Sequence, residues 1–224
     1  MDFKVSDLNQ LIIEFDHDQN FKYDDFYVSK SNEHVFNLLD NWPNWEKNFL
    51  NIYGENFSGK THLINIFLKK FKGIKLDAHS LNNENLKNIK IHENIILENL
   101  NNNTNQELLY TLFNIIEQDN KYLVVTSKKP IVEINFDLVD LKSRTKNFLL
   151  QGIERPDDEL MFALILKNLS DRQISLDKKL INYIIKRIER SYSNIFDFIY
   201  KIDEISLKKK RSIDFKIIKE ALGE

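Results

Sequence analysis

One short loop constrains the fold of this chain more than any other part of its sequence. It reads Gly54-Glu55-Asn56-Phe57-Ser58-Gly59-Lys60-Thr61 and matches the pattern G-x-x-x-x-G-K-[ST] in full. An apolar run precedes the loop and helical spacing follows it, which is the strand–loop–helix context that the pattern needs. The chain has only five glycines, and its own residue frequencies put a chance match on the order of 10⁻³. The loop therefore predicts a phosphate-binding P-loop in an α/β fold.

The backbone and two side chains explain what such a loop does. Glycines let successive backbone N–H groups turn inward around a phosphate, and the helix that follows adds positive potential at its N-terminus. Lys60 is expected to reach the β- and γ-phosphates, and the Thr61 hydroxyl is expected to bind Mg²⁺. The sequence thus predicts a site for ADP or ATP with Mg²⁺.

A later apolar run, 95–97, ends in Glu98 and Asn99. The Glu98 carboxylate can bind the Mg²⁺ ion directly or through water, since this metal prefers oxygen ligands. The Asn99 amide cannot act as a general base toward an attacking water. This pair predicts a site that holds nucleotide and hydrolyses it only weakly by itself.

Apolar runs and helical patterns alternate from residue 49 to residue 152. The runs are short, rich in Ile, Leu and Val, and do not alternate with polar residues, which is typical of strands buried on both faces. Helical spacing of apolar residues lies between them. Such alternation predicts a largely parallel sheet. The runs lie at 49–53, 74–76, 95–97, 122–125 and 148–150.

After residue 152 the strand patterns stop and four helical patterns follow. We expect an α/β nucleotide-binding domain at 23–153, a small helical domain at 154–224 and a flexible tail at 1–22. Polar caps and proline mark the expected helix starts. These starts are Pro156 at the first helical position, Ser175, Ser193 or Asn194, and Ser212.

Composition excludes several classes of protein. The chain has no cysteine, which rules out disulfide scaffolds, thiolate zinc sites and iron–sulfur clusters. Its 32 basic and 34 acidic residues give a net charge of −2, which argues against binding nucleic acid over the whole surface. No secretory leader pattern is present, and no apolar stretch approaches the roughly 18 residues of a membrane span. We expect a cytoplasmic protein without a membrane partner.

Five segments, together with 155–159 and 187–191 in the expected lid helices, resemble the DnaA-like branch of the AAA+ ATPases, and the resemblance spans nearly the whole chain. It implies an AAA+ P-loop NTPase core with a parallel sheet, followed by a small all-helical lid domain. The segments are Asp25-Phe26-Tyr27-Val28-Ser29, Asn41-Trp42-Pro43-Asn44-Trp45, Gly59-Lys60-Thr61-His62-Leu63, Val125-Thr126-Ser127 and Asp140-Leu141-Lys142-Ser143-Arg144.

The resemblance also implies roles for single residues. It makes Thr126 and Ser127 the sensor-1 residues, and it makes Arg144 an arginine finger acting in trans, a device that can accelerate hydrolysis by ~10³–10⁵. The alternative for Arg144 is a surface ion pair with Asp140 or Glu154. The nucleotide-binding residues that it implies are Phe26, Val28, Gly54, Glu55, Asn56, Phe57, Ser58, Gly59, Lys60, Thr61 and His62, with Thr61 and Glu98 at the Mg²⁺.

Several positions depart from this pattern or stay ambiguous. Glu98 replaces the usual Asp of this branch, and Lys128 stands where an acid is common. Ser193 falls where DnaA, the replication initiator, has its sensor-2 arginine. Arg190, one turn earlier, is either a substitute for that arginine or a solvated lid residue. The basic run 208–211 is either a solvated turn or a contact to the DNA backbone.

A motif at the N-terminus suggests a further partner. Gln10, Leu11, Ile13 and Phe15 resemble the short motif that docks in the sliding-clamp pocket, with an amide for orientation and apolar anchors for burial. The alternative is an edge strand of the same domain.

Short regulatory members of this branch act on the replication initiator DnaA, and the resemblance implies the same partners here. With the DNA-loaded sliding clamp of DNA polymerase III, the protein would promote hydrolysis of initiator-bound ATP, and ADP would be its own ligand. Because the chain ends soon after the lid pattern, DNA contact is expected only through the clamp. A homo-oligomer stays open. The alternative function is an autonomous AAA+ ATPase such as a helicase loader; the position of the loop argues against a small P-loop kinase.

Overall fold

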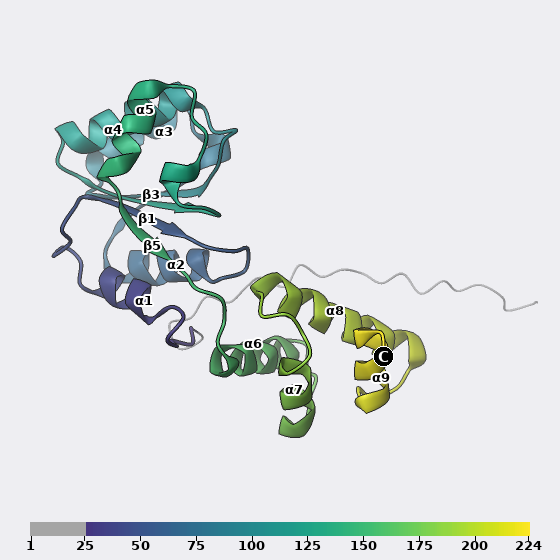
Figure 1. Cartoon of the computed structure of the whole chain (residues 1–224). Coiled ribbons are helices and arrows are strands. Elements are labelled where there is room, and N and C mark those ends of the chain that lie inside the picture. Colours follow the sequence, from purple (N-terminus) through teal and green to yellow (C-terminus); the bar gives the residue numbers. More distant parts are fainter. Residues whose placement is uncertain (1–25) are drawn as a thin grey trace, which may run out of the picture.

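The computed structural model describes residues 26–224 (Figure 1). In this part of the chain, one sheet of five parallel strands has the order β2-β3-β4-β1-β5. The parallel sheet that the apolar runs predict is therefore confirmed, together with the α/β class. The strands are β1 (Phe49–Tyr53), β2 (Gly73–Asp77), β3 (Asn94–Leu100), β4 (Tyr122–Ser127) and β5 (Leu149–Gly152).

Helices cover both faces of this sheet (Figure 1). One face packs on α1 (Glu33–Asp40) and α2 (Lys60–Lys70), and the other on α3 (Asn83–Asn88), α4 (Gln106–Gln118) and α5 (Val139–Arg144). Successive strand residues point to opposite faces. Both faces are buried in the central strands β3 and β4, which explains why the runs 95–97 and 122–125 are apolar at successive positions. Short 3₁₀ turns lie at Ala78–Ser80, Ile89–Ile91, Ile131–Glu133 and Thr145–Asn147.

The register aligns the carboxyl ends of the strands at one edge of the sheet. Tyr53, the last residue of β1, pairs with Ser127 of β4 and with Gly152 of β5. Ligands of open parallel sheets bind at this edge, and the phosphate loop begins here.

The C-terminal helices form a separate lid with its own apolar core, beside the sheet (Figure 1). Aliphatic side chains from each helix fill that core, as a stripe of period 3.6 requires. No helix in residues 26–224 is long and apolar enough to cross a membrane. The lid helices are α6 (Asp158–Asp171), α7 (Lys178–Ile185), α8 (Tyr192–Lys209) and α9 (Phe215–Leu222).

All four predicted helix starts in the lid are wrong by one to three residues. Each true cap accepts a hydrogen bond from a backbone N–H of the first turn, as Asp157 does from Leu160 N at 2.8 Å. Pro156 therefore precedes the cap and is not the first helical residue, because the Asp157 carboxylate already satisfies these donors. The observed caps are, in chain order, Asp157, Asp177, Ser191 and Asp214. They replace the expected starts at Pro156, Ser175, Ser193 or Asn194, and Ser212.

Candidate functional site

The phosphate loop joins β1 to α2 at the carboxyl edge of the sheet. Its first residue, Gly54, donates its N–H to the carbonyl of Ser127 at 3.2 Å, so the loop starts beside the end of β4. Gly59 has a φ of +89°, and a Cβ added there would lie 3.0 Å from Phe26 Cε2. Glycine is needed at Gly59 for the backbone conformation and for the close approach of Phe26.

The Lys60 ammonium lies inside the curl of this loop. Its Nζ donates to the carbonyls of Gly54 and Glu55 at 2.8 and 2.6 Å, and to Ser58 Oγ at 3.2 Å. Burial, and next the positive charge of Lys128, lower the pKa of Lys60 to about 8 from its ordinary 10.5. The site therefore holds a cation whose environment favours an added negative charge, as phosphate would supply.

Glu98 supplies a buried carboxylate near the end of β3. It is 6% exposed, and Oε2 forms an ion pair with Lys75 Nζ at 3.2 Å. Among the described residues, Glu98 Oε1 has no hydrogen-bond partner. A buried carboxylate oxygen without a partner is costly, and a cation or its water shell would satisfy it. The Glu98 oxygen therefore fits a cation such as Mg²⁺.

Asn99, next to Glu98, is turned away toward β2. It has a φ of +62° and lies in an irregularity of the β3–β4 ladder. Its N–H donates to Thr126 Oγ1 at 3.1 Å, and its amide donates to Asp77 Oδ2 at 2.6 Å. Asparagine tolerates this left-handed conformation better than most residues. The Asn99 amide is thus engaged with Asp77, and an amide cannot act as a general base toward water.

The two sensor-1 candidates are buried at the end of β4. Thr126 accepts the hydrogen bond from the Asn99 N–H. The Ser127 hydroxyl accepts from Asn51 Nδ2 at 2.9 Å and donates to the Lys129 carbonyl at 2.6 Å. Thr126 and Ser127 thus fix the geometry between β3, β4 and the phosphate loop.

A cleft of about 2520 Å³ lies between this edge of the sheet and the lid. Its volume exceeds the usual ~300–1,000 Å³ of a small-molecule site. Of the predicted site residues, Val28, Gly54, Glu55, Glu98 and Arg144 are not among its lining residues. Sequence reasoning missed the lid side chains Tyr192 and Phe196, because nothing local marks which lid residues face the loop. The predicted site residues that line the cleft are Phe26, Asn56, Phe57, Ser58, Gly59, Lys60, Thr61, His62, Thr126 and Ser127.

Arg144 ends α5 outside this cleft. Its guanidinium forms an ion pair with Glu117 of α4, with Nη1 and Oε2 2.6 Å apart, and lies over the Tyr110 ring at 4.9 Å. The side chain is 27% exposed. The ion-pair alternative named Asp140 or Glu154 as the partner, and both are wrong, because Arg144 turns toward α4.

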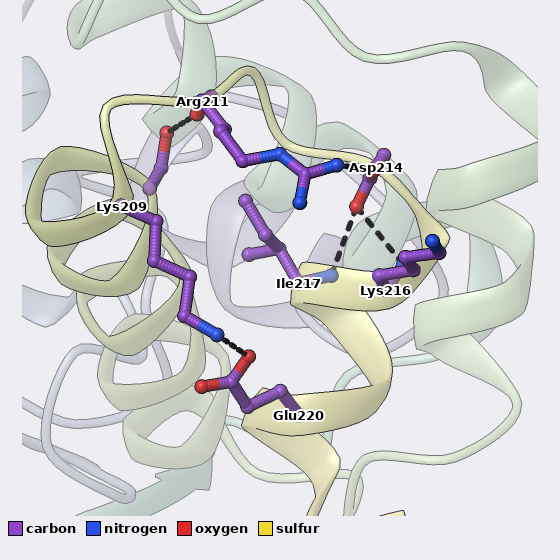
Figure 2. Close-up of polar contacts among 7 residues, drawn as sticks. Lys209, Arg211, Asp214, Lys216, Ile217 and Glu220 are labelled. Atoms are coloured by element: carbon purple, nitrogen blue, oxygen red, sulfur yellow. Dashed lines mark hydrogen bonds and ion pairs between the residues drawn. The ribbon is translucent and has the colours of Figure 1, made fainter.

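The remaining lid candidates have contacts within the lid or with the loop. Arg190 forms an exposed ion pair with Asp158 at 2.6 Å, and Ser193 Oγ donates to Glu55 Oε1 at 2.7 Å. In the basic run, Lys208, Lys209 and Arg211 each pair with a carboxylate around the α8–α9 turn, and Figure 2 shows the last two. These pairs favour the solvated-turn interpretation over a DNA contact. The motif Gln10, Leu11, Ile13 and Phe15 lies outside the described residues.

Comparison with known proteins gives consistent relatives. A model of the family described as "Hda, lid domain" matches residues 157–222. The chromosomal replication initiator protein DnaA of Thermoanaerobacter sp. (strain X514) is 26% identical over 91% of this chain and 52% of its own length. The DnaA protein of Borreliella afzelii (strain PKo) is 24% identical over 92% of this chain and 48% of its own length. The chain thus spans about half the length of the curated relatives it matches.

Solved structures share the fold. Domain III of the Thermotoga maritima replication initiation protein DnaA aligns with a TM-score of 0.70 and 18% identity, over 91% of this chain and 95% of that one. AMPPCP-bound DnaA from Aquifex aeolicus aligns with a TM-score of 0.63 and 20% identity, over 83% of this chain and 68% of that one. The Thermotoga maritima RuvB Holliday junction branch migration motor, at 12% identity, reaches a TM-score of 0.60 over 78% and 61%. Residues 157–222 therefore match a lid domain of the Hda type, and the chain as a whole is similar to the DnaA-like AAA+ proteins in sequence and fold.

Proposed function

We propose that this protein is a nucleotide-binding regulator of replication initiation, which acts with the DNA-loaded sliding clamp to stimulate ATP hydrolysis on the DnaA initiator. The observation that carries this proposal is the position of Arg144. It ends α5, outside the cleft that contains the chain's own phosphate loop. A guanidinium there is suited to a phosphate on another molecule, where its fixed charge offsets charge that develops on the transferring phosphoryl group.

Glu117 holds this arginine without binding it strongly. An exposed ion pair contributes only ~0–1 kcal/mol, and Glu117 is 57% exposed. The guanidinium can therefore exchange the carboxylate for a phosphate at little cost. Lysine would keep the charge and lose the planar fork that contacts two oxygens at once.

The chain's own site is proposed to bind ADP or ATP with Mg²⁺ and to turn ATP over slowly. Support comes from the Lys60 cradle, from the Glu98 oxygen that has no partner within residues 26–224, and from the amide of Asn99. The fold neighbours include AMPPCP-bound DnaA. When bound, Mg²⁺ would neutralise charge on the phosphates. Lys60 and the loop would hold the phosphates, and Thr61 and Glu98 would hold the ion.

The partners follow from the same proposal. The tail at 1–22 would dock in the clamp through Gln10, Leu11, Ile13 and Phe15, and DNA would be reached only through the clamp. The core at 23–153 would carry the nucleotide and Arg144, and the lid at 154–224 would cover the nucleotide.

Phosphate release from initiator-bound ATP, with clamp and DNA held constant, tests the proposal. The wild type should accelerate release, while Arg144→Ala and Arg144→Lys should both fail. Arg187→Ala is the matched control, because Arg187 also pairs with a glutamate, Glu224, and lies over a tyrosine ring in the lid. Full stimulation by Arg144→Ala would refute the proposal. Turnover by the protein alone above roughly 1 s⁻¹ would favour the autonomous ATPase instead.

A further inference from the structure

The phosphate loop fastens itself to the lid through the side chain of Glu55. This carboxylate accepts hydrogen bonds from Ser191 Oγ, from Tyr192 N at 3.1 Å and from Ser193 Oγ at 2.7 Å. These three donors form the N-terminus of α8, whose unpaired N–H groups and dipole favour a negative charge. Glu55 therefore caps a helix that belongs to the lid.

The ionisation of Glu55 agrees with this contact. Burial acts to raise its pKa, but the hydrogen bonds from Ser191, Ser193 and the backbone of Tyr192 outweigh burial, so the pKa lies below its ordinary 4.5. The carboxylate is therefore charged at neutral pH, and its negative charge lies at the N-terminus of α8, where the helix dipole favours an anion.

A second side chain of the loop also contacts α8. The Phe57 ring packs against the Phe196 ring in a tilted arrangement, with centroids 4.6 Å apart and an interplanar angle of 30°. Phe57 has a φ of +64°, in the left-handed region that disfavours a bulky residue. It keeps this conformation although more than half of its surface is exposed. Strain of this kind in a ligand loop points to a function for the side chain that bears it.

Contacts from two other segments hold the start of α8. The N-terminus of α8 already has its anion in Glu55, and Ser193 contacts Glu55 with its hydroxyl. On the other side, the Tyr192 hydroxyl donates to the Glu154 carbonyl at 3.0 Å, so the start of α8 is held from two directions.

We propose that Glu55 and Phe57 determine the phosphate specificity of the site, by holding α8 on the phosphate loop without a γ-phosphate. The site would then retain a nucleoside diphosphate as firmly as a triphosphate, and it would release either one slowly. This inference rests on the proposed function in one respect, that the loop binds a nucleotide.

Two measurements on the full chain test it. The first is the dissociation rate of a fluorescent ADP analogue, and the second is the ratio of Kd for ATP to Kd for ADP. Glu55→Gln should speed ADP dissociation by roughly 10- to 100-fold, as the loss of hydrogen bonds to a charged group implies. It should also shift the ratio toward ATP, because the γ-phosphate can then use the positive end of α8. Phe57→Gly should act in the same direction, and its backbone suits the left-handed φ.

A matched control and a double variant separate the lid contact from a general charge effect. Glu189→Gln removes a carboxylate that bonds Asn194 near the same helix start without touching the loop, so dissociation should stay at the wild-type rate. As a single variant, Ser193→Ala should speed ADP dissociation. Combined with Glu55→Gln it should add little, because both substitutions weaken the same contact between the loop and α8.

Hydrogen exchange of the Tyr192 amide, without nucleotide, gives a readout that does not depend on binding. Exchange should speed up in Glu55→Gln and stay unchanged in Glu189→Gln. If the wild type binds nucleotide while Glu55→Gln matches it in dissociation, ratio and exchange, the inference is wrong and the proposed function stands. If the wild type binds neither ADP nor ATP, the proposed function is wrong and the specificity inference falls with it.

Discussion

Raising the pH should weaken nucleotide binding far earlier than an ordinary lysine would allow. Lys60 lies in the phosphate loop with a pKa of about 8, since burial and then Lys128 lower it more than Glu55 and Glu98 raise it. Bound phosphate favours the charged ammonium and so raises this pKa in the complex. Binding then needs a proton on Lys60. Affinity should be constant below the free pKa and fall above it.

The magnitude follows from the protonated fraction of Lys60. With a pKa of about 8, roughly nine tenths of the amines are protonated at pH 7 and roughly one tenth at pH 9. The Kd for ADP should therefore rise about tenfold between pH 7 and pH 9, which is ~1.4 kcal/mol of binding free energy. A lysine at its ordinary value would leave Kd unchanged over this range.

Calorimetric titration with ADP at several pH values checks this, and two buffers of different ionisation enthalpy would report proton uptake near pH 8. Lys128→Ala should move the fall in affinity to higher pH, because it removes a cation that lowers the Lys60 pKa. Lys60→Arg should give a flat profile, since arginine stays protonated. A constant wild-type Kd from pH 7 to pH 9 without proton uptake would refute the reasoning.

Three further outcomes concern stability and the tail. Arg144→Ala should change the free energy of unfolding in urea by less than about 1 kcal/mol, because its ion pair is solvent-accessible; a larger loss would give Arg144 a structural role. Asp157→Ala should cost ~1–2 kcal/mol in thermal unfolding, since it removes the α6 cap and the acceptor of the Ser31 hydroxyl; an unchanged Tm would contradict the capping assignment. Gln10→Ala with Leu11→Ala should abolish clamp pull-down and leave the circular dichroism unchanged, whereas loss of folded signal would support the edge-strand alternative.

The sheet could be predicted because its signal is local. A strand such as 122–125 is apolar at successive positions, and this follows from burial on both faces wherever its neighbours lie. The end of β3 could not be predicted in the same way. It continues past the polar pair Glu98 and Asn99 to Leu100. Asn99 has a left-handed φ at an irregularity of the β3–β4 ladder, and Leu100 pairs with Ser127 beyond it. In the sequence, the polar pair Glu98 and Asn99 instead indicates that the strand ends at residue 97.

Helix starts and cross-domain contacts required the three-dimensional structure. Several capping residues stand within three positions of each lid helix, and packing of the apolar stripe decides among them, so Asp214 caps α9 and not Ser212. The motif indicates the phosphate loop, but nothing in it indicates that Glu55 reaches α8 or that Arg144 reaches Glu117. Such pairs join distant segments, and their partners depend on how the elements pack.

The burial of Tyr192 has a consequence for how the two halves of the chain come apart. This residue opens a lid helix, yet it is 2% exposed and belongs to the apolar cluster of the sheet domain, which includes Leu63 of α2 and is joined from the lid by Leu160 of α6. A lid that melted by itself would pull this ring into water and remove a side chain from the core next to α2. Partial unfolding of the lid is thereby penalised by the sheet domain, and the two cores are coupled into one cooperative unit at the start of α8.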